Sequence, residues 1–191
     1  MRRRALFLAA AILALTGGTS LGRGAWIFAK AELAQVLLER AWQRTLEGGE
    51  RVRPWSWADT WPVARLRAPR HEAEMIVLAG SSGAVLAFGP GHLDGSARPG
   101  EVGNTVIAGH RDTHFEFLRD LELGDAITLE SASGSQSEYR IESLRIVDAS
   151  DGSAIQPTAR ETLTLVTCYP FDALVPGGPL RYVVRASKVI S

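Results

Sequence analysis

The single cysteine and one of the four histidines occupy positions where a nucleophile and an acid/base partner could work together. Cys168 ends the run Thr162-Leu-Thr-Leu-Val-Thr-Cys-Tyr-Pro, and His110 follows a glycine in Ala-Gly-His-Arg. Pro170 cannot donate a hydrogen bond to a β-ladder, so a strand over this run should stop just after the cysteine. A thiol at a strand end is accessible, and a thiol paired with a histidine can carry out acyl transfer.

A third candidate, Arg181, opens the apolar strand Arg-Tyr-Val-Val-Arg-Ala. If this strand pairs antiparallel with the strand before Cys168, the two residues face each other across the base of the loop 169–180. The guanidinium of Arg181 could then stabilise a developing oxyanion, with His110 as the acid/base. Arg185 lies four residues further on the same face, about 13 Å away at ~3.3 Å per residue, and is expected to be a surface or barrel-rim cation.

The same region could also support chemistry other than acyl transfer. His110 and His114 are four apart and could form a metal site with Cys168. A glycine-flanked turn and a neighbouring arginine argue against an ion there, so no metal and no cofactor is predicted. His114 is expected to be a structural residue on a short helix. Asp112 and Asp120 are interpreted as solvated surface carboxylates, and calcium is not predicted.

The chain after residue 62 changes from helical periodicity to short strands rich in Val, Ile, Leu and Thr. Two hairpins are predicted to close at Ser81-Ser82-Gly83 and at Ser133-Gly134-Ser135. A short helical insert is predicted only at Thr113–Leu121. Eight short strands with little helix predict a closed barrel or a sandwich. The predicted strands are Val63–Arg67, Met75–Ala79, Ala84–Phe88, Thr105–Ala108, Ala126–Glu130, Glu138–Val147, Thr162–Thr167 and Tyr182–Ala186.

The N-terminus reads as a membrane anchor. Three arginines at 2–4 precede an apolar run that is continued by small residues to Gly22. A helix over this stretch is about 27 Å long at ~1.5 Å per residue, close to the bilayer core of ~30 Å. We predict an uncleaved anchor, with an interfacial belt at 26–28, the arginines in the cytoplasm and the body outside it. A cleaved signal peptide is the alternative, although no clean small-x-small site ends the run.

Spacing and composition divide the chain into three parts. Residues 1–28 are the predicted anchor, 29–54 a helical stalk or linker, and 55–191 the catalytic domain. The helix of the stalk should end at Leu46, because Gly48 and Gly49 follow. Equal numbers of basic and acidic residues, 21 of each, give no basic excess for a nucleic-acid partner. One cysteine excludes an internal disulfide.

The motifs quoted above resemble those of one enzyme family. Thr-Leu-Thr-Leu-Val-Thr-Cys resembles the nucleophile strand of sortases, whose signature is Thr-Leu-x-Thr-Cys, and Ala-Gly-His-Arg resembles their histidine motif. The arginine that opens the next strand matches their third catalytic position. The string Gly103–Phe115 is similar to the proteobacterial (Gram-negative) sortase group. The resemblance runs from about Trp55 to Ala186.

This resemblance implies a mainly β, eight-stranded sortase-type barrel with short helical inserts, preceded by an N-terminal transmembrane or stalk helix. It implies Cys168 as nucleophile, His110 as acid/base and Arg181 as oxyanion or substrate stabiliser. The implied reaction cleaves a Leu-Pro-x-Thr-Gly-like C-terminal sorting signal of an exported protein through a thioacyl-enzyme. The acyl group then passes to an amine, of unknown identity, or to water. The implied location is the inner membrane, with the catalytic domain facing the periplasm.

Two alternatives stay open beside this interpretation. The barrel could be a catalytically inactive, membrane-tethered assembly or binding protein, although an intact Cys168, His110 and Arg181 speak against it. The unrelated cysteine-dependent peptidoglycan transpeptidases also use Cys, His and Arg. Their Ser-x-Gly-Cys elbow, with an arginine just after the cysteine, is absent from this sequence.

Overall fold

A computed structural model describes the backbone of residues 2–173, 175 and 177–189. Within the first helix, the side chains at 2–12, 14, 21, 25, 27 and 28 are outside this description. The chain forms two compact units, Met1–Val36 and Leu37–Ser191. The boundary falls within helix α1 (Arg2–Leu46), so the segment predicted as a stalk, 29–54, is shared between both units.

Helix α1 ends at Leu46, as its glycines predicted. Gly48 has a φ of +97°, a left-handed conformation that glycine adopts without a steric penalty. The N–H of Gly48 donates to the carbonyl oxygen of Thr45, and the N–H of Gly49 to that of Arg44, both at 3.0 Å. These bonds satisfy carbonyl groups that the last helical turn would otherwise leave without partners.

The predicted membrane anchor gains no support from the structure. In the part of the chain that is described, no helix combines the length and the apolar character needed to cross a bilayer. The anchor over residues 1–28 therefore stays a prediction. The arginines at 2–4 and the belt residues Ile27 and Phe28 have side chains outside the described set.

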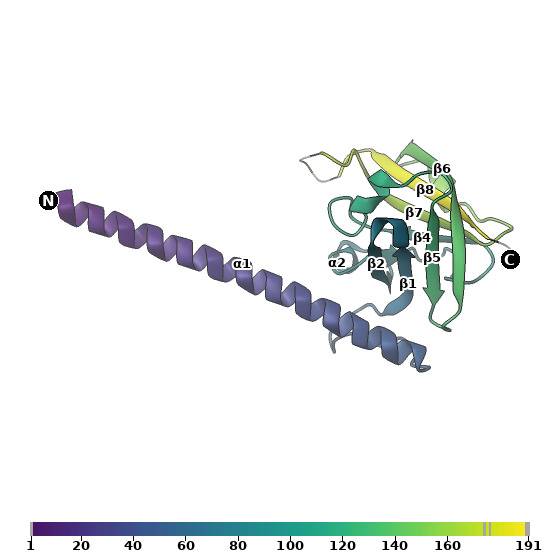
Figure 1. The fold of residues 1–191 in the computed structure, drawn as a ribbon, viewed down its shortest axis with the longest axis horizontal. Helices are drawn as coiled ribbons and strands as arrows, with labels where there is room; N and C mark the ends of the chain where they lie inside the picture. The colour runs from purple at the N-terminus through teal and green to yellow at the C-terminus, as the bar shows by residue number, and fades with distance from the viewer. Residues whose placement is uncertain (1, 174, 176, 190–191) are drawn as a thin grey trace. The chain divides into compact units, whose positions relative to one another are not determined.

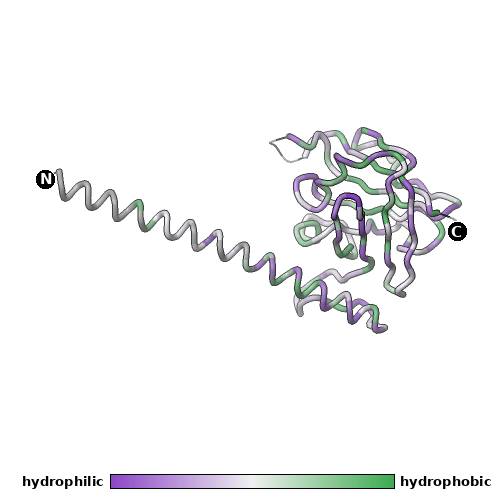
Figure 2. The backbone as a smooth tube through the Cα atoms, in the orientation of Figure 1, coloured by the Kyte–Doolittle hydropathy of each residue, from purple (hydrophilic) through white to green (hydrophobic). Residues whose placement is uncertain are grey.

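The second unit is built on eight strands that close into a barrel in the order β1-β2-β3-β4-β7-β8-β6-β5 (Figure 1). This confirms the predicted mainly β, eight-stranded architecture. Hydrophobic and hydrophilic residues interleave along the strands (Figure 2), as expected when one face lines a core and the other meets solvent. The strands are β1 (Pro62–Ala68), β2 (Ala73–Ala79), β3 (Gly91–His92), β4 (Asn104–Ala108), β5 (Ala126–Ser131), β6 (Gln136–Asp148), β7 (Thr162–Tyr169) and β8 (Leu180–Lys188).

One predicted strand is wrong. Residues 84–88 were expected to be extended, but Gly83–Leu86 forms the short helix α2, capped by the hydroxyl of Ser82, which accepts a hydrogen bond from the N–H of Val85. The eighth strand is instead β3, only two residues long and parallel to β2. Parallel neighbours need a crossover connection, so the hairpin predicted at 81–83 does not form and α2 lies in the crossover.

The other local predictions hold. The hairpin between β5 and β6 closes where expected, with the N–H of Ser131 donating to the carbonyl oxygen of Ser135 at 2.9 Å. The helical insert predicted at 113–121 is the 3₁₀ helix η2 (Glu116–Asp120). Two further 3₁₀ helices are η1 (Pro69–His71), between β1 and β2, and η3 (Gly152–Ile155), in the connection from β6 to β7.

Two apolar clusters stabilise the second unit. The interior of the barrel is filled by fully buried side chains such as Leu66, Ile107 and Leu165. The end of α1 contributes to the second cluster, in which Leu38, Trp42, Ile76, Leu78 and Val85 pack together.

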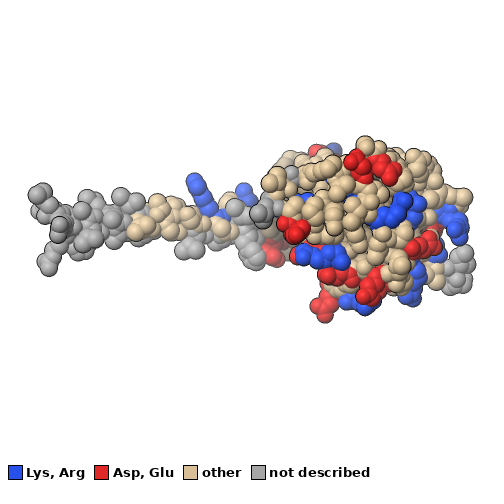
Figure 3. Space-filling model, turned by 90° about the horizontal axis from the view of Figure 1, so that it is seen from above, with Lys and Arg blue, Asp and Glu red and all other residues tan. Residues whose placement is uncertain are grey.

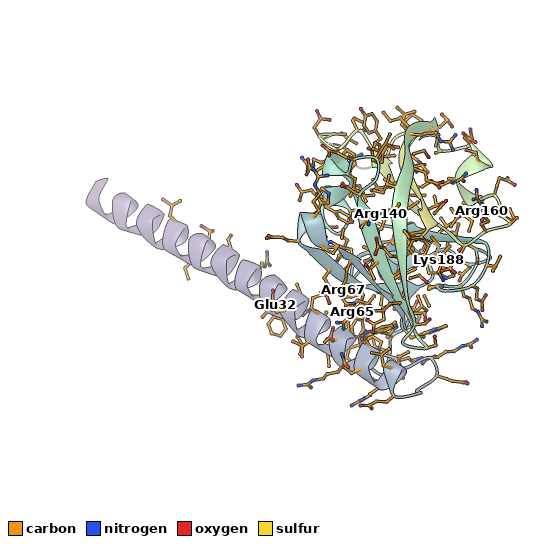
Figure 4. All side chains as sticks on the ribbon, turned by 45° about the vertical axis from the view of Figure 1, so that its right-hand side comes forward. Glu32, Arg65, Arg67, Arg140, Arg160 and Lys188 are labelled. Atoms are coloured by element: carbon orange, nitrogen blue, oxygen red, sulfur yellow. The ribbon has the colours of Figure 1, made fainter. Side chains whose placement is uncertain are left out.

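Charged side chains surround these clusters. The guanidinium of Arg65, on β1 (Figure 4), lies 5.9 Å from the ring centroid of Trp42 and also pairs with Glu39. On the face seen in Figure 3, basic and acidic side chains are interspersed.

Candidate active site

The positions of Cys168 and His110 follow from the parallel pairing of β4 with β7. The ladder runs from Asn104 opposite Thr162 to Ala108 opposite Val166, and the N–H of Gly109 extends it by donating to the carbonyl oxygen of Val166 at 3.1 Å. His110 and Cys168 each lie two residues beyond the last pair (110 − 108 and 168 − 166). They therefore stand level at the same end of two neighbouring strands.

The antiparallel pairing of β7 with β8 places Arg181 directly opposite Cys168, as predicted. Paired residues of an antiparallel ladder project from the same face of the sheet. Leu165 of β7 and Val184 of β8 point into the barrel core, so Cys168 and Arg181 project from its outer face. His110 is exposed, and Cys168 and Arg181 are half-buried. The structure thus brings the three predicted residues to one end of three neighbouring strands, while their catalytic roles stay a prediction.

A side-chain hydrogen bond fixes the turn that carries His110. The hydroxyl of Thr167 donates to the carbonyl oxygen of Gly109 at 2.7 Å, and both groups are buried. A Cβ on Gly109 would lie 2.7 Å from ring atoms of the fully buried Phe115. Only glycine fits this approach, which explains the residue before the histidine. The N–H of Phe115 in turn donates to the carbonyl oxygen of His110 at 2.9 Å.

The loop from β7 to β8 is held by arginines. Nη1 of Arg181 donates to the carbonyl oxygens of Gly178 at 2.8 Å and Leu180 at 2.9 Å. Nη2 of Arg111 donates to those of Ala173 and Val175, both at 2.9 Å. The peptide bond before Pro170 is cis, and β7 ends at Tyr169, close to the predicted end.

An aromatic cluster covers the first part of this loop. The rings of Tyr169 and Tyr182 stack with centroids 6.3 Å apart, and Phe171 meets Tyr182 edge-on at 5.2 Å. The guanidinium of Arg119, on η2, lies 5.8 Å from the centroid of Phe171. Burial, and then the neighbouring Tyr169, raise the pKa of Tyr182. The residues that follow the thiol are therefore packed against the barrel.

The far half of the same outer face is covered by the connection that contains η3. The amide of Asn104 donates to the carbonyl oxygens of Ala154 and Gln156, and the hydroxyl of Thr164 donates to the Asn104 side chain at 2.7 Å. Arg185, opposite Thr164, donates to the carbonyl oxygen of Ser153 at 3.0 Å. Arg185 therefore holds this connection, four residues along β8 from the level of Cys168.

His114 has a different environment from His110. It is half-buried in the turn before η2, and burial, followed by the charge of His110, lowers its pKa. His114 lines a cavity of about 760 Å³ between the start of β2 and the turn 113–120, but none of Cys168, His110 and Arg181 does. Among the described residues, no group of three or more His, Cys, Asp and Glu side chains is arranged to hold a metal ion.

Three residues of this region had no role in the sequence-based prediction. Thr167 appeared only as part of the run that precedes Cys168, although its hydroxyl anchors the histidine turn. The sequence indicated Arg111 only as a cation that argues against a metal ion, although it binds the carbonyl oxygen of Ala173. Phe171 carried no signal beyond its apolar character. The one sequence feature that could have indicated the hydrogen bond from Thr167 to Gly109 was a threonine just before the nucleophile.

Comparison with known proteins agrees with this geometry. A family model described as the sortase domain matches residues 66–189, more than half of the chain. Sortase D of Bacillus subtilis (strain 168) is 38% identical over 125 residues, which are 65% of this chain and 62% of that protein. The chain thus spans less than two thirds of that relative's length.

Solved structures have the same fold. The Clostridium perfringens sortase D5 transpeptidase matches with a TM-score of 0.62 at 26% identity, covering 79% of this chain and 88% of that one. The C. perfringens sortase C, solved with the C-terminal cell wall sorting motif, matches with a TM-score of 0.63 over 85% and 91% of the two chains. At 18% identity it shows the fold alone. Barrel, motifs and family match together establish that the chain belongs to the sortase family.

Proposed function

We propose that this chain is a cysteine transpeptidase that cleaves a Leu-Pro-x-Thr-Gly-like sorting signal near the C-terminus of an exported protein. The observation that carries the proposal is the register in which Cys168 pairs with Arg181 and stands level with His110. Sortases are cysteine transpeptidases, and one of the same fold was solved with a C-terminal cell wall sorting motif. That motif is the substrate class we propose here.

The first half of the reaction forms a thioester. The thiolate of Cys168 attacks the threonine carbonyl carbon, and the electrons of the C=O bond move to the oxygen. Nη1 of Arg181 is engaged by loop carbonyls, so Nε and Nη2 are the donors proposed to face this oxyanion. The C–N bond to glycine then breaks, and protonated His110 gives its proton to the leaving amine.

The second half returns the enzyme to its starting state. An acceptor amine gives a proton to His110, and the nitrogen of the amine attacks the thioester carbonyl carbon. The C–S bond breaks, the acyl group leaves on the new amide, and the Cys168 thiolate is restored. Water can replace the amine, with hydrolysis as the slower outcome. These steps use no metal and no organic cofactor.

The proposal is tested by peptide cleavage. Wild-type protein should cut a Leu-Pro-x-Thr-Gly peptide between Thr and Gly, and with added hydroxylamine it should release the threonine hydroxamate. Cys168→Ala should do neither, while unfolding at the wild-type temperature. Cleavage by Cys168→Ala at a near wild-type rate would contradict the mechanism.

An inactive assembly or binding protein is the alternative function. A mechanism-based electrophile that mimics the sorting signal separates the two, because it labels Cys168 only in a working site. A folded protein that stays unlabelled would favour the inactive alternative. The intact sequence at Cys168, His110 and Arg181 supports activity.

We further propose that the protein is held in the inner membrane by residues 1–28, with the catalytic unit facing the periplasm. The support is the sequence: three arginines followed by an apolar run without a clear cleavage site. Mass spectrometry of the membrane fraction should find the N-terminal segment still attached. A mature N-terminus near residues 20–30 would contradict the anchor and leave the enzyme proposal unaffected.

The assignment to the proteobacterial sortase group is also a proposal. It rests on the string Gly103–Phe115. A neighbouring gene for an exported protein that ends in a Pro-containing motif, an apolar run and basic residues would support it and identify the substrate.

A further inference from the structure

Arg111, the residue after His110, is a buried cation whose contacts are backbone carbonyl groups. The residue is 6% exposed. Nη2 donates to the carbonyl oxygens of Ala173 and Val175 at 2.9 Å each, and Nη1 is buried without a hydrogen-bond partner. Among the described residues, no carboxylate forms an ion pair with it.

Burying a guanidinium without a counter-charge is costly, so the hydrogen bonds of Arg111 must offset that cost. Its partners both belong to the loop between β7, whose penultimate residue is Cys168, and β8, whose second residue is Arg181. The carbonyl oxygens that Arg111 binds are 62 and 64 residues away in the sequence. Arg111 thus ties the turn of the acid/base to the loop that joins the nucleophile to the oxyanion donor.

The other end of the loop is tied by Arg181 itself, through the carbonyl oxygens of Gly178 and Leu180. If the loop moves, Nη1 of Arg181 loses the two hydrogen bonds that hold the guanidinium, and Nε and Nη2 lose their orientation. If Arg111 is removed, the middle of the loop loses its two charge-assisted hydrogen bonds. The two arginines together bind four carbonyl oxygens of one short segment.

We infer that Arg111 is a positioning residue: it holds the β7–β8 loop in the conformation that binds the sorting peptide and orients Arg181. The inference rests on the proposed function, since it assigns a role within that reaction. Arg111 does not touch the reacting atoms, and the thiol and His110 keep their places without it. Its loss therefore impairs reaction with a peptide but not reaction with a small reagent.

The experiment compares Arg111→Met with wild type. Methionine keeps an unbranched apolar stem and removes the charge and all donors. Peptide cleavage should fall by an amount on the order of 10²-fold, the scale seen when reacting groups are misplaced by about 1 Å. Alkylation of Cys168 by iodoacetamide should stay within about twofold, and amide hydrogen exchange in residues 171–180 should accelerate.

Arg140→Met is the matched control. Arg140 (Figure 4) also donates to a backbone carbonyl oxygen, that of Gly124 at 3.2 Å, but it is exposed and lies on β6. It should leave cleavage, alkylation and exchange unchanged. Arg111→Lys, which keeps the charge, should recover part of the lost cleavage.

Three results would overturn the inference: unchanged cleavage in Arg111→Met, unchanged exchange of the loop, or alkylation that falls in step with cleavage. The last would show that Arg111 acts on the thiol or on folding. If wild-type protein cleaves no sorting peptide, the proposed function fails. The exchange measurement still reports whether Arg111 holds the loop.

Discussion

The hydroxyl of Thr167 donates a 2.7 Å hydrogen bond to the carbonyl oxygen of Gly109, joining the residue before the thiol to the residue before the histidine. The bond crosses between two parallel strands just beyond their last ladder pair, Ala108 with Val166. It therefore sets the level of His110 relative to Cys168 at the point where the main-chain ladder ends.

Thr167→Val should separate this bond from packing, because valine has nearly the same shape. We expect a loss of about 1 kcal/mol in the free energy of unfolding, the usual contribution of one buried hydrogen bond. Cleavage of the sorting peptide should fall by about 10-fold or more, since His110 is no longer held level with Cys168. Denaturant unfolding and peptide kinetics measure the two effects, and Thr167→Ser, which keeps the hydroxyl, should lie close to wild type. Equal activity of the two variants would contradict the role of the bond.

Gly109→Ala should displace the histidine turn. The added methyl would lie 2.7 Å from the ring of Phe115, which is fully buried and cannot move away. Such overpacking costs about 1–3 kcal/mol, and cleavage should fall beyond what the lost stability explains. Gly83→Ala is the control, because a Cβ there meets nothing within 4 Å. A Gly109→Ala protein with wild-type kinetics would show that the position of His110 is less constrained than the structure indicates.

Arg181→Lys and Arg185→Lys should differ sharply in activity. Lysine keeps the charge of Arg181 but not its planar pair of donors, so kcat should fall by an amount on the order of 10²-fold. Arg185 lies opposite Thr164, four residues from the thiol, and donates a hydrogen bond to the carbonyl oxygen of Ser153. Arg185→Lys should therefore leave the activity nearly unchanged. Peptide kinetics, with thermal unfolding as the folding control, decide the matter. The reverse ranking would mean that Arg185 is the third catalytic residue.

Asp125 should make the fold sensitive to acid. Burial raises its pKa, but hydrogen bonds from the N–H of Glu122, from His71 and from Arg70 outweigh this and bring it from 3.8 to about 2. A carboxyl whose pKa is lower in the folded state stabilises the fold above pH ~4, and this contribution disappears as the pH falls towards 2. Asp125→Asn should therefore lose roughly 1–2 kcal/mol at pH 7 and show a shallower decline between pH 4 and 2.

Urea unfolding at several pH values measures this effect. The exposed Asp112→Asn serves as the control and should retain the wild-type profile. Parallel profiles for Asp125→Asn and wild type would show that the contacts of Asp125 contribute nothing to stability.

The sequence predicted one half of the site better than the other. Antiparallel pairing of β7 and β8 could be inferred because two apolar strands flank one short loop, and Cys168 indeed lies opposite Arg181. The parallel pairing of β4 with β7 has no such local sign, because 53 residues separate the two strands (162 − 108 − 1). Paired residues of β4 and β7 are 58 positions apart, and so are His110 and Cys168. This agreement can be recognised only when the register of the two strands is known.

The errors have equally specific causes. Ala84–Phe88 has the composition of a strand, but Ser82 caps a helix there, and the segment lies in the crossover to the two-residue strand β3. The segment therefore forms the helix α2. Arg111 could not be assigned a role because its partners are backbone carbonyl groups, which no residue type encodes. The end of α1 packs on the barrel through Leu38 and Trp42. Helical periodicity predicts that these side chains are buried, but it does not predict which residues they contact.

Closure of the eight strands into a barrel has a consequence for recognition. Many proteins bind an extended peptide by β-augmentation, in which the ligand joins an open sheet edge and its main chain supplies most of the affinity. A sheet that closes on itself offers no such edge. Under the proposed function, a sorting peptide that reaches Cys168 on the outer face of β7 must be recognised through side chains and connecting loops, residue by residue. Motif preference could therefore be reprogrammed by exchanging loops, without altering the strands that hold the thiol.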